Sequence, residues 1–141
     1  MSEVIPYLYI KGAAKAIDFY TRAFGARETY ARITDGDGRV GHAELTIGAS
    51  TIFLADEHPE IGVISPATLG GSHMSFVINL PNVDDVVKQA VAVRDACVGL
   101  AGAERTRVEA DRLGGALDVE VRDHLGRHGM SFPAAVRLRS A

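Results

Sequence analysis

Near the start of the chain, the spacing of hydrophobic residues changes from a pattern typical of a β-strand to one typical of an α-helix. Residues 4–10 (VIPYLYI) alternate as in a β-strand, so that Ile5, Tyr7 and Tyr9 share one face. Apolar residues then recur at every third or fourth position over residues 13–24, which predicts an amphipathic helix. Gly25 follows as the residue that ends this helix.

Three more strands are predicted before residue 57. They cover residues 27–33 (RETYARI), 39–47 (RVGHAELTI) and 51–55 (TIFLA). Glycine-rich turns at 35–38 (DGDG) and 48–50 (GAS) separate them. The first half therefore has the order β-α-β-β-β, and the segment 57–72, rich in proline and glycine, is predicted to link it to the second half.

The second half repeats this order of elements. Residues 73–80 predict a strand, and Asn82 is a favourable start for a helix whose apolar stripe runs from Val83 to Val91. Residues 92–103 either extend this helix or form an insert. Later strands are predicted at 104–109, 116–122 and 129–132. The chain is thus predicted to be one α+β domain, residues 1–141, built from βαβββ modules at 4–56 and 73–133.

Composition excludes several classes of function. The chain of 141 residues carries a formal net charge of -3 and has no block of lysine and arginine. The sequence therefore does not indicate a basic surface that would bind the phosphates of a nucleic acid. No stretch approaches the ~20 apolar residues that would span a membrane, and no signal peptide is recognised at residues 1–6. The single cysteine, Cys97, favours a reducing, cytoplasmic location.

Several segments carry a resemblance to a known family. They are YLYIKG (7–12), AIDFY (16–20), AFGA (23–26), HAELTIG (42–48), GSHMSFV (71–77) and VRDHLG (121–126). Together they resemble the vicinal-oxygen-chelate superfamily, which contains glyoxalases, bleomycin resistance proteins and extradiol dioxygenases. The resemblance implies a curved mixed sheet of two βαβββ modules around a cleft, usually in a homodimer, with a small molecule as ligand.

Enzymes of that superfamily hold a divalent metal with one side chain from each of four strands. The resemblance places these positions near Ile5, Phe53, His73, and Met130 or Ser131. Only His73 is a suitable ligand, because isoleucine and phenylalanine offer no lone pair and a thioether suits soft copper. The sequence therefore predicts a metal-poor member of the family with no cofactor.

His42 and Glu44 stand two positions apart on one predicted strand, so they share a face. They could form an acid–base pair, or join His73 in a relocated site for Zn, Fe, Ni or Mn, or line a wet cavity as a polar strand face. The third interpretation is favoured, and Glu44 could then offset a cationic group on a ligand. Aromatic residues on the same face would stack on a flat ligand, although sheet packing or a dimer interface would also explain them.

The predicted function is non-catalytic binding or sequestration of a small molecule, an antibiotic or another aromatic compound. The predicted ligand-binding residues are Tyr7, Tyr9, His42, Glu44, Phe53, His73 and Ser75. One alternative is a metal-dependent lyase, isomerase or dioxygenase with the relocated metal site. Another is a structural or regulatory module whose cleft has collapsed.

Overall fold

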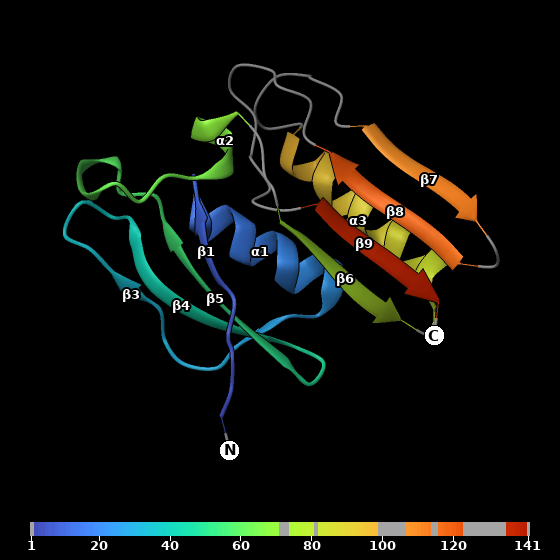
Figure 1. The fold of residues 1–141 in the computed structure, drawn as a ribbon, viewed down its shortest axis with the longest axis horizontal. Helices are drawn as coiled ribbons and strands as arrows, with labels where there is room; N and C mark the ends of the chain where they lie inside the picture. Colours follow the sequence, from blue (N-terminus) through green and yellow to red (C-terminus); the bar gives the residue numbers. More distant parts are fainter. Residues whose placement is uncertain are drawn as a thin grey trace.

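The computed structural model describes residues 2–70, 74–80, 82–98, 107–113, 116–122 and 135–140. Two modules of similar topology make up the fold (Figure 1). The elements of the first are β1 (Tyr7–Ile10), α1 (Ala13–Phe24), β2 (Arg27–Glu28), β3 (Ile33–Thr34), β4 (Val40–Ile47) and β5 (Ser50–Asp56). Those of the second are β6 (Ser75–Leu80), α3 (Val83–Val98), β7 (Arg107–Leu113), β8 (Ala116–Arg122) and β9 (Ala135–Ser140). Between the modules lie η1 (Pro59–Ile61) and α2 (Pro66–Leu69).

The first module is a mixed sheet with strand order β1-β5-β4-β2, and β3 pairs with the other end of β4. β1 runs parallel to β5, and β5 runs antiparallel to β4. This register aligns Tyr7 with Phe53 and Phe53 with Glu44 across three neighbouring strands. Residues from separate parts of the sequence therefore form one row across the sheet.

Helix α1 covers one face of this sheet and forms the core with it. The helix buries Ile17, Phe19 and Tyr20, and the strands contribute Leu45 and Leu54. Each of these side chains is at most 2 % exposed. The predicted alternation in β1 is confirmed, because Leu8 and Ile10 are buried while Tyr7 and Tyr9 are exposed on the opposite face.

The second module repeats the pairing of the first. β6 is parallel to β9, as β1 is to β5, and β7 is antiparallel to β8. β8 and β9 lie side by side (Figure 1). Helix α3 packs against α1, with Ala90 and Val93 in the same core cluster, and the side-chain amide of Gln89 donates to the carbonyl of Arg22. The α+β arrangement of two βαβββ modules is thus observed.

The strand predicted over residues 27–33 was wrong as a continuous element. It is two short pairings, β2 and β3. After Thr29, whose N–H donates to the carbonyl of Glu44 on β4, residues 30–32 lie between the two pairings and belong to no strand. From Glu28, opposite Leu45, to Ile33, opposite His42, this side advances five residues while β4 advances three. The two extra residues on this side have no partner position on β4, so the pairing is interrupted there.

Element boundaries in the second module also differ from some of the sequence predictions. The strand predicted at 104–109 is found as β7 at Arg107–Leu113, while 116–122 is confirmed as β8. Residues 92–98 extend α3. The strand predicted at 129–132 falls outside the described residues, and the strand that pairs with β6 is β9 at Ala135–Ser140.

One carboxylate joins the start of α1 to both central strands. Gly12, which precedes the helix, has a left-handed φ of 85° and no capping side chain of its own. Instead, Asp56 Oδ1 accepts the backbone N–H groups of Gly12 and Ala13, at 2.8 and 2.9 Å. Asp56 Oδ2 accepts the N–H of Val40 at 2.8 Å. The carboxylate therefore acts as a remote N-cap for α1 and fixes it to β4 and β5.

Candidate functional site

The face of the first sheet opposite α1 gathers five predicted site residues. Strand alternation directs them away from the core, because their neighbours Leu8, Ala43 and Leu54 are buried against the helix. Tyr7 and Tyr9 are 38 % and 37 % exposed, and the other three are half-buried. We refer to this set as the candidate site; it consists of Tyr7 and Tyr9 on β1, His42 and Glu44 on β4, and Phe53 on β5.

Aromatic rings in the candidate site contact one another in defined orientations. Tyr7 and Tyr9 are stacked, with ring centroids 5.0 Å apart and an angle of 26° between the planes. Phe53 presents an edge-to-face contact to Tyr7 at 5.8 Å and to the ring of His42 at 5.0 Å. Such contacts hold the rings in place, so a flat ligand could stack on them with little loss of side-chain entropy.

A chain of polar contacts runs beside these rings. The Tyr7 hydroxyl lies 2.7 Å from His42 Nδ1, and His42 Nε2 lies 3.4 Å from Glu44 Oε1. An ionised carboxylate can only accept, so the neutral imidazole places its proton on Nε2. Nδ1 then accepts, and the Tyr7 hydroxyl donates to it. The donor–acceptor order is therefore Tyr7 to His42 to Glu44.

The hydroxyl of Tyr7 stays protonated near neutral pH. Burial raises its pKa above the ordinary value of 10.0, and the neighbouring phenol of Tyr9 raises it further. A neutral phenol is a hydrogen-bond donor and a weak acid. This group suits ligand binding or proton donation better than attack as a phenolate.

The donor set does not fit the metal site that enzymes of the resembled family use. Among the described strands β1, β5, β6 and β9, the only carboxylate is Asp56, and its two oxygens already accept three backbone N–H groups. Ile5 and Phe53 supply no donor atom. Within the described part of the chain, no three histidine, cysteine or acidic side chains are grouped to hold an ion.

Two of the predicted ligand-binding residues are not placed by the structure. His73 lies outside the described residues, as do Met130 and Ser131. Ser75 begins β6 in the second sheet, where its backbone is in register with Ala135, and its side chain is not described. The participation of His73 and Ser75 in the site stays a prediction.

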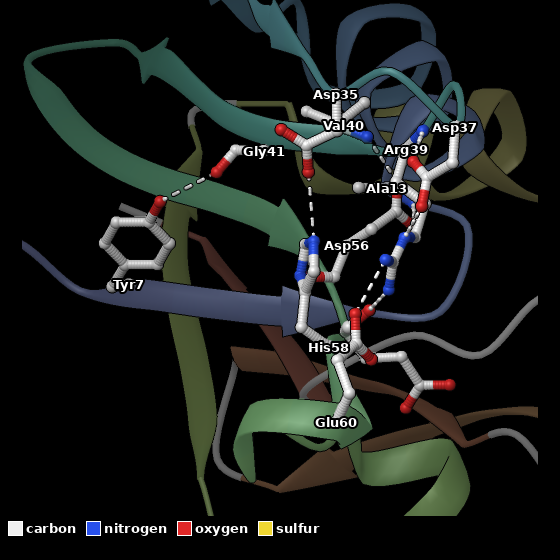
Figure 2. A network of polar contacts seen from close by, with 11 residues as sticks. Tyr7, Ala13, Asp35, Asp37, Arg39, Val40, Gly41, Asp56, His58 and Glu60 are labelled. Carbon is white, nitrogen blue, oxygen red and sulfur yellow. Dashed lines mark hydrogen bonds and ion pairs between the residues drawn. The ribbon is translucent and has the colours of Figure 1, made fainter.

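A polar network that no sequence pattern indicated borders the candidate site (Figure 2). Arg39 contacts Asp37 at 2.6 Å and Glu60 at 2.7 Å, and it also donates to the carbonyl of Glu57. His58 lies 3.0 Å from the carboxylate of Asp35. These contacts tie the β3–β4 turn to the segment after β5. The sequence predicts the turn at 35–38, but the contacts of Asp35 with His58 and of Arg39 with Glu60 join residues 23 and 21 positions apart, which no local pattern indicates.

Comparisons with known proteins agree with this fold. The family model described as Glyoxalase/Bleomycin resistance protein/Dioxygenase superfamily matches residues 4–132. An uncharacterized protein of Mycobacterium bovis, Mb0911c, is 32 % identical over 126 residues, which are 87 % of this chain and 77 % of that protein.

Solved structures also match across the whole chain. A bleomycin-binding protein complexed with bleomycin is 17 % identical, with a TM-score of 0.61 and coverage of 100 % of this chain and 98 % of that one. The fosfomycin resistance protein FosX from Mesorhizobium loti is 10 % identical, with a TM-score of 0.61 and coverage of 99 % and 92 %. Among the described residues, no helix is long and apolar enough to cross a membrane.

Proposed function

Because this chain belongs to the glyoxalase/bleomycin resistance protein/dioxygenase superfamily, we propose that it binds a planar aromatic small molecule at the candidate site without a transition metal. The observation that carries the proposal is the set of stacked and edge-to-face rings held together on an accessible sheet face. The bleomycin-binding relative supports the same kind of role for the fold. Binding requires affinity and no catalytic metal, so the apolar side chains of Ile5 and Phe53 at two of the family's metal-ligand positions do not impair it.

Glu44 gives this site a preference for a cationic ligand. Its carboxylate is half-buried beside Phe53, and its contact with the imidazole of His42, at 3.4 Å, is long. The carboxylate therefore keeps capacity to accept from a ligand ammonium or N–H group. A flat ring that carries a positive charge would stack on the tyrosines and pair with Glu44. We further propose that the protein acts in the cytoplasm as a homodimer.

Matched probes test the charge preference. The probes are 9-aminoacridine, which is cationic at neutral pH, and acridine, which is neutral and of nearly the same shape. We expect Glu44→Gln to weaken binding of the cation about fivefold, on the order of 1 kcal/mol, and to leave the neutral probe unchanged. Fluorescence titration measures both affinities.

The control variant is Asp18→Asn, which removes a carboxylate charge from the exposed ion pair with Arg22 on α1, on the opposite face of the sheet. It should bind both probes as wild type does. If Glu44→Gln weakens both probes equally, or neither, the charge preference is wrong. If wild type binds neither probe, the proposed ligand class is wrong.

One observation favours the alternative of a metal-dependent enzyme. His42 Nε2 and Glu44 Oε1 are close enough to bind one ion together, and His73 could supply a third ligand. Protein purified without chelators should contain far less than one transition-metal ion per chain by plasma mass spectrometry. Near-stoichiometric zinc, iron, nickel or manganese, lost in His73→Ala, would replace the binding proposal with a lyase, isomerase or dioxygenase.

A further inference from the structure

The ring of His58 lies between two groups that can only accept hydrogen bonds. Nδ1 is 3.0 Å from the backbone carbonyl of Asp56, and Nε2 is 3.0 Å from Asp35 Oδ2. A neutral imidazole carries one N–H, so it satisfies one of these contacts and turns a lone pair toward the other oxygen. Both contacts are hydrogen bonds only when the ring is doubly protonated. The geometry thus selects the imidazolium form.

The Asp35 carboxylate also touches the strand that carries His42. A Cβ placed on Gly41 would lie 2.6 Å from Asp35 Oδ1, so any larger residue at this position would require the carboxylate to shift. The carbonyl of Gly41 lies 3.5 Å from the Tyr7 hydroxyl, and Gly41 directly precedes His42. Figure 2 shows the hydrogen bond of Tyr7 with Gly41 and the contact of Asp35 with His58, with the Asp35 side chain beside Gly41. The ion pair therefore borders the candidate site through one residue of β4.

The other charges around His58 come from two elements. Arg39, on the same turn as Asp35, opposes the positive ring, while Glu60 on η1 favours it. The carboxylate of Asp56 faces away, toward the N–H groups of Gly12, Ala13 and Val40. The hydrogen bond that His58 donates to the Asp35 carboxylate is the strongest of these influences, and it raises the pKa of His58 above its ordinary 6.5.

We propose that the pair Asp35–His58 is a pH-dependent clasp that holds the β3–β4 turn against the segment after β5 and thereby positions Gly41, His42 and Tyr7. As a regulator of ligand capture, it rests on the proposed function. The positive ring is favoured in the fold, so the clasp is complete below the ordinary pKa of histidine. It is lost as the pH rises through the higher value of the folded protein. Ligand capture should therefore be stronger in mildly acidic solution.

Nuclear magnetic resonance of the ligand-free protein tests the clasp. Between about pH 5 and 9, ring ¹⁵N shifts report the protonation of each histidine. We expect His58 to carry protons on both nitrogens at pH 6 and to titrate at a higher midpoint than in Asp35→Asn. In wild type, the Gly41 amide and the Tyr7 ring should change at the His58 midpoint, and in His58→Gln this change should disappear.

The ring ¹⁵N shifts of His42 are recorded in the same spectra. A pH-dependent change at the Gly41 amide can therefore be matched either to the His42 ring or to the His58 ring. Asp18→Asn is the control, because it removes a carboxylate from the exposed ion pair with Arg22 on α1 and should leave the His58 midpoint unchanged. A His58 midpoint at or below 6.5 in wild type, or equal midpoints in wild type and Asp35→Asn, would overturn the clasp. So would a Gly41 profile that His58→Gln does not alter.

None of these measurements requires a ligand. A failed clasp would leave the acridine titrations untouched as a test of the binding proposal. Conversely, if acridines do not bind, the histidine ring shifts still decide whether the clasp exists.

Discussion

Asp56→Ala is expected to lower the free energy of unfolding by about 4 kcal/mol, because three backbone N–H groups lose their acceptor at once. Asp56 is 9 % exposed, so water reaches the freed donors poorly. An unsatisfied buried donor costs about 1–3 kcal/mol, and loss of an N-cap alone costs about 1 kcal/mol. The change would be a large part of the 5–15 kcal/mol, roughly, that stabilises an average domain. Urea unfolding measures it.

Two further variants show whether the capping role is responsible. Asp56→Asn keeps one accepting oxygen and should lose roughly half as much stability, since its NH₂ group must face one backbone donor. Asp18→Ala removes an exposed aspartate from α1 itself and should cost less than about 1 kcal/mol. Equal losses for Asp56→Ala and Asp18→Ala would contradict the assignment of Asp56 as the remote cap.

Tyr7→Ala is expected to weaken 9-aminoacridine binding about 30-fold, on the order of 2 kcal/mol, because Tyr7 touches every other ring of the candidate site. Its removal takes away one stacking surface and leaves Tyr9 and His42 without the neighbour that orients them. Fluorescence titration at constant pH gives the affinity.

Tyr7→Phe separates the ring from the hydroxyl. It preserves the stack with Tyr9 and deletes the hydrogen bond to His42, so the loss should be about fivefold. Tyr30, which is 70 % exposed and is not one of the candidate-site residues, supplies the matched control, and Tyr30→Ala should bind as wild type does. If Tyr7→Ala also binds as wild type does, the ligand lies elsewhere.

Local patterns were sufficient to predict the parts of the first module that build the core. Helix 13–24 and the strands at 39–47 and 51–55 each combine clear periodicity with a glycine-marked boundary. The alternation in β1 and β4 was also enough to place Tyr7, Tyr9, His42 and Glu44 on faces away from the core. Where one face of a strand is strongly apolar, burial of that face fixes the direction of the other.

Contacts between distant segments could not be predicted in the same way. The hydrogen bond from Tyr7 to His42 depends on the register of β1, β5 and β4, which no local pattern specifies. Asp56 reads as the polar end of a strand, and its capping role appears only when β5 ends beside the start of α1. The prediction of one continuous strand at 27–33 was wrong because the register with β4 determines which of these residues pair and which do not.

Binding at the candidate site is tested most directly by titrating isotope-labelled protein with 9-aminoacridine at pH 6 and following backbone and aromatic resonances. We expect saturable shifts centred on Tyr7, Tyr9, His42, Glu44 and Phe53, without added metal. Shifts centred instead on the exposed apolar side chains of Ile61 and Leu69, or no saturable shift in the candidate site, would show that the candidate site does not bind this ligand.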